Sequence, residues 1–270
     1  MSWLAILPLV VLIGISLKYC WWLPPVSDQH PRILMYHMIC ESSEQRYRGL
    51  RVHPARFAKQ VAWLKDNGWT FVTMSDLERR IRQRADLRRI VALTFDDGYA
   101  DNYYQALPVL RQHGAKATLY LVVNRHSQDW SVKKKAHHDG GELMREPKLS
   151  DEQVQEMLAE GIFELGGHTL NHCHLPSTQD QVKIDEIAGC KQALEATFGQ
   201  TVTSFAYPFG HYGQGDVRIV REQGFGTGVT TKEGINKNPD LMQLKRIKVS
   251  GKDNFLAFWI RMRLGFRGLI

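Results

Sequence analysis

Apolar residues follow two patterns along the chain: short continuous runs, and longer segments with helical spacing. Residues 33–36 (ILMY) form a continuous run of the kind that makes a buried strand. Residues 54–67 (PARFAKQVAWLKDN) have helical spacing, with Pro54 at the first helical position and Gly68 after the last. Strands are predicted over 33–36, 69–74, 90–95, 117–123, 163–167, 202–207, 225–230 and 244–249. Helices are predicted over 54–67, 180–198 and 215–223. Another begins at the capping box Ser75–Glu78, one passes through Leu107 and Leu110 and ends near Gly114, and one runs from Ser150 to Gly161.

Strands and helices therefore alternate at regular spacing. That order is typical of βαβ units and predicts an α/β fold with a parallel sheet, either open or closed into a barrel. Polar residues follow several predicted strands, namely His37, Asp96, Asp97, His168 and the turn after Tyr207. In a barrel these strand ends share one face, which is where such folds carry their active sites.

The N-terminal segment has a different character. Residues 2–17 (SWLAILPLVVLIGISL) carry no charge, and apolar residues resume after Lys18. If Lys18 reaches the interface, the segment is just long enough for a bilayer, which needs about 20 residues. A cleaved signal peptide is the alternative, but the segment has no basic start and no small-x-small cleavage site. We expect a transmembrane anchor over 1–23 and a linker over 24–32.

Composition narrows the class of protein. With 43% hydrophobic and 23% charged residues, the chain is neither disordered nor fibrous. Four scattered cysteines exclude a disulfide framework. The net charge of +7 points to an anionic neighbour such as a membrane surface, a nucleic acid or an acidic polymer. No nucleic-acid-binding motif supports the second of these, and no Gly-rich nucleotide motif is present.

Two adjacent carboxylates, Asp96 and Asp97, end a predicted strand in the sequence TFDDG. Adjacent carboxylates repel unless a cation or a proton separates their roles. Neighbouring side chains on an extended chain point in different directions, so one can bind a metal while the other faces a substrate. The alternative is a surface turn, which Asp-Asp-Gly often forms.

Two histidines, His168 and His172, lie four residues apart in HTLNH, directly after another predicted strand. In a helical or turned segment this spacing fits one metal ion, and a carboxylate would complete a set with open positions for water and substrate. Ordinary core or surface histidines are the alternative, and we expect the nearby His174 to be a bystander. A third motif, AYPFG, could form a groove wall with Tyr207 and Phe209.

In order and spacing, these three motifs resemble those of the polysaccharide deacetylases, carbohydrate esterase family 4 with its NodB homology domain. TFDDG is similar to their first motif, HTLNH to their second, and AYPFG to their third. The similarity runs from about Ile33 to Val249. It implies a distorted (β/α) barrel, a catalytic domain over 33–254, and metal-dependent removal of acetyl groups from sugars.

The resemblance also implies roles for individual residues. Asp97, His168 and His172 would bind one divalent metal, usually zinc, with nickel or cobalt as other options. Asp96 would be the general base that activates water, and Tyr207 and Phe209 would bind substrate. These roles agree with what amide hydrolysis needs: a polarised carbonyl, a deprotonated water and an acid for the leaving amine.

Two positions depart from the commonest family pattern. Many members have an arginine two residues before the proline of the third motif, where this chain has Ala206. Many have a Leu-x-His near the C-terminus, where this chain has Leu244-Lys245-Arg246. Both departures resemble the branch that deacetylates poly-β-1,6-N-acetylglucosamine in biofilm matrices, which looks circularly permuted. On that comparison His37 is the general acid and Arg246 orients Asp96; the alternative is that His37 merely caps its strand.

The expected function is a membrane-anchored, metal-dependent deacetylase of an N-acetylhexosamine polysaccharide. A deacylase, for acetyl or formyl groups, of a lipid-linked aminosugar is the second hypothesis. An inactive carbohydrate-binding member is the third. The basic segment 255–270 either lies on a lipid membrane or packs as the last barrel helix. Basic flanks favour a cytoplasmic domain, whereas a polymer substrate favours the outside. We expect a single-pass inner-membrane protein with its catalytic domain in the periplasm.

Overall fold

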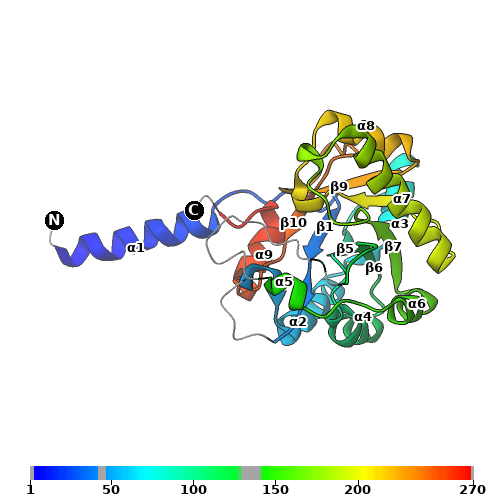
Figure 1. Cartoon of the computed structure of the whole chain (residues 1–270). Helices are drawn as coiled ribbons and strands as arrows, with labels where there is room; N and C mark the ends of the chain where they lie inside the picture. Colours follow the sequence, from blue (N-terminus) through cyan, green and yellow to red (C-terminus); the bar gives the residue numbers. More distant parts are fainter. Residues whose placement is uncertain (1–2, 42–46, 127, 129–140, 269–270) are drawn as a thin grey trace.

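A ring of seven parallel strands forms the centre of the molecule (Figure 1). The computed structural model describes residues 3–41, 47–126, 128 and 141–268. In spatial order the ring contains β1 (Arg32–Tyr36), β5 (Ile90–Asp96), β6 (Ala117–Leu121), β7 (Phe163–Gly167), β8 (Ser204–Ala206), β9 (Thr227–Glu233) and β10 (Leu244–Lys248). The ring closes because β1 pairs with both β5 and β10: Leu34 lies opposite Leu93 on one side and Ile247 on the other. The sequence left an open sheet or a barrel as alternatives, and the structure is a barrel.

Three short strands lie outside this ring. β4 (Thr70–Val72) pairs with the start of β5. β2 (Met38–Ile39) and β3 (Arg51–Val52) form a separate parallel pair directly after β1.

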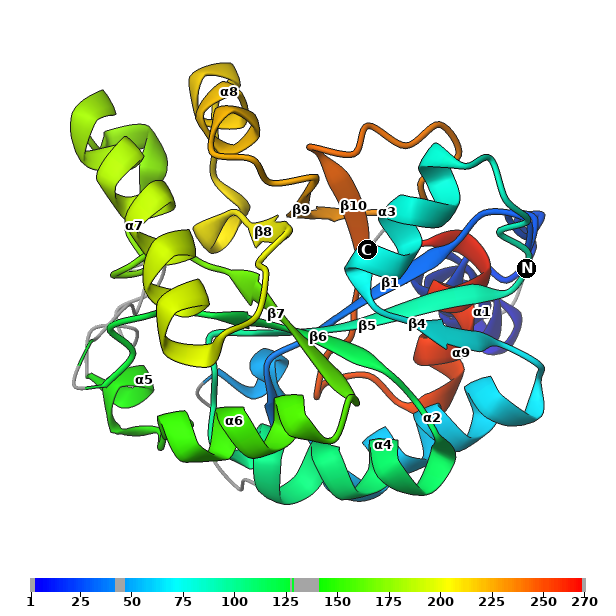
Figure 2. The same cartoon turned by 90° about the vertical axis from the view of Figure 1, so that its right-hand side faces the viewer.

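Helices surround the barrel (Figure 2). The neighbouring α2, α4 and α6 run along one side of it, and α7 packs against α8 on another. Their bounds are α2 (Pro54–Asp66), α3 (Met74–Arg82), α4 (Leu107–His113), α5 (Glu142–Arg145), α6 (Asp151–Ala159), α7 (Asp180–Phe198), α8 (Gln214–Glu222) and α9 (Phe255–Leu264). Single turns occur as η1 (Arg48–Leu50), η2 (a π-helical turn, Asn102–Ala106), η3 (Leu175–Ser177) and η4 (Pro208–Gly210).

Local capping explains where two of these helices begin. Ser150 and Gln153 form a reciprocal capping box at the start of α6, as the sequence predicts. The N-terminus of α3 differs from the prediction, because Thr73 rather than Ser75 accepts the hydrogen bond of the Asp76 N–H. Ser75 instead contacts Glu164 of β7 through both its N–H and its hydroxyl, so a tertiary contact overrides the local motif.

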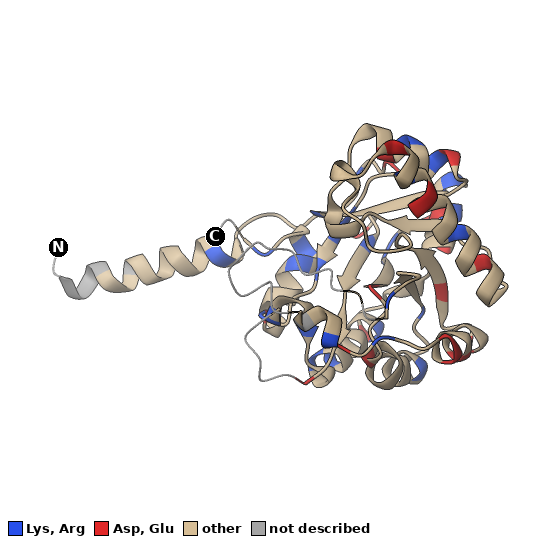
Figure 3. Ribbon diagram, in the orientation of Figure 1, with Lys and Arg blue, Asp and Glu red and all other residues tan. Residues whose placement is uncertain are grey.

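The N-terminal helix α1 (Trp3–Tyr19) projects from the barrel and carries one charged residue, Lys18 (Figure 3). It has 17 residues and ends at Cys20, whose φ of 45° breaks the helix. In the part of the chain that the structure describes, no helix combines the length and apolarity needed to cross a membrane. The described residues therefore give no support to the prediction of a transmembrane helix over 1–23.

The C-terminal helix α9 packs on the barrel instead of standing away from it. Phe258, Ile260 and Met262 are buried. Arg261 is also buried, and it donates hydrogen bonds to Asp253 and Glu233, both at 2.8 Å. Of the two alternatives for 255–270, the structure therefore has the packed helix.

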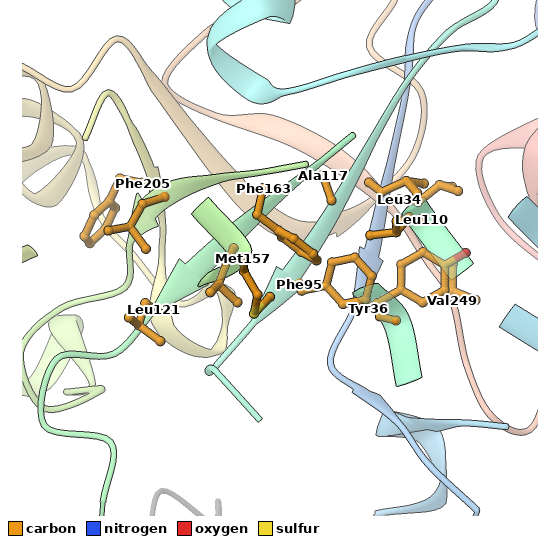
Figure 4. Close-up of a cluster of buried hydrophobic side chains, with 14 of the residues drawn as sticks. Leu34, Tyr36, Phe95, Leu110, Ala117, Leu121, Met157, Phe163, Phe205 and Val249 are labelled. Carbon is orange, nitrogen blue, oxygen red and sulfur yellow. The ribbon is translucent and has the colours of Figure 1, made fainter. Parts of the chain in front are cut away.

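The main hydrophobic core lies between the strands and the outer helices (Figure 4). Tyr36 of β1 stacks on Phe95 of β5 with ring centroids 5.4 Å apart, and Leu110 and Met157 approach from α4 and α6. Side chains alternate along a strand, so Phe95 on the helix side leaves Asp96 on the other. The sheet thereby directs one carboxylate of the TFDDG motif away from the apolar core.

Packing inside the barrel gives a stability prediction. A Cβ at Gly166 of β7 would lie 2.5 Å from Cδ1 and 2.6 Å from Cε1 of the buried Tyr120. We expect Gly166→Ala to lower the free energy of unfolding by about 1–3 kcal/mol, measured by urea denaturation. Gly215→Ala is the control, since a Cβ there meets nothing within 4 Å and α8 gains helix propensity. Equal stability of the two variants would contradict this close approach.

Candidate metal centre and active site

The two carboxylates of the TFDDG motif are separated by a sharp turn. Asp96 is the last residue of β5, and Asp97 and Gly98 follow with φ values of 77° and 79°. The Asp97 N–H donates to the Tyr120 carbonyl at 3.0 Å. A Cβ at Gly98 would lie 2.4 Å from Cδ1 of Leu121, so this turn requires glycine. The two carboxylates consequently face different partners.

Asp97, His168 and His172 meet at the carboxyl ends of β5 and β7. Asp97 Oδ1 lies 3.3 Å from His168 Nε2 and 3.4 Å from His172 Nε2, and all three side chains are buried. Ligand atoms on a tetrahedral zinc ion with bonds of about 2.0–2.1 Å are separated by about 3.3 Å. The spacing and the donor set therefore fit one divalent transition-metal ion.

The two histidines reach this position through a turned segment. Thr169 and His172 have φ values of 66° and 54°, so HTLNH is not helical. His168 Nδ1 lies 2.7 Å from the Ala206 carbonyl oxygen, which can only accept. His168 therefore carries a proton on Nδ1, which leaves Nε2, the atom that faces Asp97, as the one that would ligate a metal ion. Such an outer hydrogen bond is typical of metal-binding histidines.

The pKa shifts of Asp97 and His172 favour the protonation states that bind a cation. Burial by itself would raise the pKa of Asp97, but hydrogen bonds with His168 and His172 hold it well below its usual value. Burial lowers the pKa of His172, although Asp97 opposes this. An ionised carboxylate and a neutral imidazole are the forms that ligate metal.

Asp96 has a separate partner, Arg246 of β10. The Arg246 guanidinium donates to both Asp96 oxygens at 2.7 Å, to the Thr230 carbonyl at 2.9 Å and to Thr94 Oγ1 at 3.0 Å. Both charged side chains are buried. Burial would raise the pKa of Asp96, but the charge and hydrogen bonds of Arg246 outweigh it and lower the pKa. Arg246 thus occupies the position that the orienting hypothesis requires, and its catalytic role stays a prediction.

His37 follows β1 and faces Asp96 from a neighbouring strand. Its Nε2 lies 4.0 Å from Asp96 Oδ2, so the two rest in proximity without a hydrogen bond. Burial lowers the pKa of His37, even though Asp97 and Asp96 favour its charged form. The side chain keeps an exposed fraction of 16%, which opens toward the adjoining cavity.

A cavity of about 390 Å³ lies over these groups. His37, Asp96 and the three metal-site residues line it, together with Phe209. Tyr207 also borders the cavity, but its side chain is buried, donates to the Met242 carbonyl at 3.0 Å and stacks on Tyr212. Of the two predicted substrate-binding residues, Phe209 is the one with an accessible ring.

Sequence reasoning missed several residues of the cavity wall. They are Met35, Tyr47, Leu50, Leu143, Thr231, Glu233 and Lys248. Glu233 and Lys248 end β9 and β10, so the strand-end rule that found His37 and His168 could have found them too. Tyr47 and Leu143 lie in segments whose sequences carry no periodic signal.

The residues after TFDDG hold the His37 segment in place. Asn102, which is fully buried, donates to the His37 carbonyl and to Asp101, each at 2.8 Å. Asp101 also accepts the Ile39 N–H and contacts the Cys40 thiol. Burial raises the pKa of Asp101 to about 7. This carboxyl is therefore protonated in the folded protein over much of the acidic range.

That shift makes stability depend on pH. Between the unfolded pKa of 3.8 and the folded value of about 7, the folded chain keeps a proton that the unfolded chain loses. The contribution of Asp101 to the free energy of unfolding therefore falls as pH rises. As the pH rises from 4 to 8, we expect the free energy of unfolding of Asp101→Asn to increase relative to that of the wild type by on the order of 3 kcal/mol. Urea denaturation at each pH measures this difference. The exposed Asp66→Asn is the control, and an equal pH dependence in both variants would refute the assignment.

The Arg246–Asp96 pair gives a second prediction. Arg246→Met leaves a buried carboxylate without its partner and should cost about 3–5 kcal/mol of unfolding free energy. In an Asp96→Asn background the same substitution should cost at least about 1 kcal/mol less. Denaturation of the four proteins of this double-mutant cycle measures the coupling. Additive effects would show that the two groups do not depend on each other.

Known proteins of similar sequence and structure identify the family of this chain. The polysaccharide deacetylase family model matches residues 83–228. YxkH of Bacillus subtilis, whose name assigns it to the polysaccharide deacetylases, is 31% identical over 231 residues, covering 85% of this chain and 75% of the relative. The poly-β-1,6-N-acetyl-D-glucosamine N-deacetylase of Staphylococcus epidermidis is 22% identical over 77% of this chain and 71% of its own. The structure of the Streptococcus pyogenes deacetylase PplD in complex with acetate superposes with a TM-score of 0.70 at 29% identity, covering 84% of this chain and 94% of that one. The chain therefore belongs to the polysaccharide deacetylase family of hydrolases.

Proposed function

We propose that this protein removes N-acetyl groups from a poly-β-1,6-N-acetylglucosamine-like polysaccharide, with one divalent metal ion, zinc in the first instance. The observation that carries the proposal is the grouping of His37, Asp96 and Arg246 from three adjacent strands. It supplies an acid candidate, a base candidate and a positioning group in one cavity. The similarity to poly-β-1,6-N-acetyl-D-glucosamine N-deacetylases supports this substrate class.

The metal centre would contribute Lewis-acid chemistry when an ion is bound. A divalent ion held by Asp97, His168 and His172 supplies Lewis-acid polarisation of the amide carbonyl and a more acidic water. The protein's own groups then handle the protons. Asp96 is ionised and held by Arg246, so its carboxylate is ready to accept a proton from water as the oxygen attacks the carbonyl carbon.

The leaving amine needs a proton, and His37 is the group placed to deliver it. Because burial keeps His37 neutral, it must first gain the proton that Asp96 has taken. The 4.0 Å between His37 Nε2 and Asp96 Oδ2 requires only a small approach for this transfer. As the C–N bond breaks, His37 protonates the amine and the acetyl group leaves as acetic acid, which ionises to acetate in solvent, so both side chains return to their starting forms.

The test uses the full chain, stripped of metal by a chelator and reloaded with zinc, nickel or cobalt. Acetate and free amine released from β-1,6-linked N-acetylglucosamine oligomers are then measured. We expect metal-dependent release that falls by about 10²–10⁴-fold in Asp96→Asn and in His37→Ala. His126→Ala, at an exposed histidine outside the cavity, is expected to keep full activity.

Two outcomes would contradict parts of the proposal. Near-complete activity of His37→Ala would assign the acid role to another group. Absence of release with every metal, despite stoichiometric metal binding, would show that the substrate class is wrong while the metal centre stands.

A further inference from the structure

A second pair of histidines lies at the rim of the active site. His174 follows the HTLNH motif and His211 follows η4, and both are exposed. His174 Nε2 lies 3.0 Å from His211 Nδ1, and the rings are nearly perpendicular with centroids 5.1 Å apart. From the sequence, His174 is expected to be a bystander, because exposed loop histidines are common. Its partner in the structure, His211, lies 37 residues further along the chain.

Ser177 contacts both the backbone carbonyl and the imidazole ring of His174. The Ser177 hydroxyl donates its one hydrogen to the His174 carbonyl at 3.1 Å. His174 Nδ1 lies 2.8 Å from the same oxygen, in a hydrogen bond whose donor depends on the tautomer of the ring. With Nδ1 as the donor, the Nε2 atom that faces His211 carries a lone pair, which is the form that ligates a metal ion. This is the same arrangement that the Ala206 carbonyl imposes on His168 at the catalytic centre.

The spacing of the two ring nitrogens suits a shared metal ion as well as a shared proton. Two imidazoles on one ion, with bonds of about 2.0–2.1 Å, place their nitrogens about 3.0–3.3 Å apart. The observed 3.0 Å falls at the short end of this range. A metal ion bound by both nitrogens would replace the proton that lies between them.

The Phe209 ring lies beside both this histidine pair and His172 of the catalytic centre. Its centroid is 4.4 Å from that of His172, 6.1 Å from His174 and 6.3 Å from His211. Phe209 also lines the catalytic cavity. An ion held by His174 and His211 would therefore lie next to the cavity wall.

We propose that His174 and His211 form a second metal site, which takes one borderline divalent ion such as Zn²⁺, Ni²⁺ or Cu²⁺. Imidazole ligands select these ions over Mg²⁺ and Ca²⁺, which prefer oxygen. With two protein ligands, water completes the coordination, so the site binds more weakly than the buried centre at Asp97. Because the ion sits beside Phe209, metal in excess of one equivalent should inhibit the enzyme.

Metal binding to the tag-free full chain tests this proposal without relying on activity. In equilibrium dialysis against Zn²⁺ we expect two ions per chain, one tight and one weak. Asp97→Ala should lose the tight ion and keep the weak one. His174→Ala and His211→Ala should each weaken the second ion by at least about 10-fold, and Ser177→Ala by a similar factor through loss of the outer hydrogen bond. His126→Ala, which removes an exposed histidine elsewhere, should bind as the wild type does.

Copper provides a direct view of the ligands. The electron paramagnetic resonance spectrum of Cu²⁺ on Asp97→Ala should show two nitrogen ligands at the weak site. Adding His174→Ala or His211→Ala should remove one of them. A single zinc ion per wild-type chain, or a second ion that both histidine variants retain, would overturn the proposal and leave a hydrogen-bonded pair that shares a proton.

Discussion

Pairing of β1 with both β5 and β10 is the constraint on which the active site depends. The first strand lies between two strands that are far from each other in sequence, and it closes the barrel. His37, Asp96 and Arg246 follow or occupy the ends of these three strands. Closure therefore turns three separate positions into one set of neighbours. An open sheet with the same strands would separate β1 from one of its partners and dismantle this set.

Closure also allows the two charges at the centre to be buried. Removing a carboxylate and a guanidinium from water is costly, and a pair recovers that cost only with good geometry and further hydrogen bonds. Here the guanidinium makes a two-point contact with Asp96, and its remaining donors reach Thr230 and Thr94. The result is a carboxylate whose pKa stays low despite its burial.

Backbone strain gathers at the same place. Asp97, Thr169, His172 and Phe209 are non-glycine residues with positive φ, and all four lie in the three motif turns. Such conformations persist only where the surroundings impose them, and they are enriched at functional sites. Each turn redirects a side chain at a strand end, toward the metal centre or toward its rim. The strain thus has a physical use, because a regular strand or helix would point these groups elsewhere.

The sequence by itself determined the local features of this protein. Apolar periodicity predicted the strands to within a few residues, and the capping box at Ser150 predicted the start of α6. Motif composition and family resemblance indicated which residues could bind a metal. These features depend on neighbours a few positions apart, so they can be recognised from the chain alone.

The tertiary structure decided what depends on distant contacts. The same periodicity suits an open or a closed sheet, and only strand pairing distinguishes them. The contact between Asp96 and Arg246 joins positions 150 residues apart, and the buried Tyr207 contacts Met242 and Tyr212, neither of which a local sequence pattern indicates. Thr73 rather than Ser75 caps α3, because Ser75 hydrogen-bonds to Glu164 of another strand. Local sequence sets the conformation of each segment, but register and closure set which segments meet, and the chemistry of this site arises where they meet.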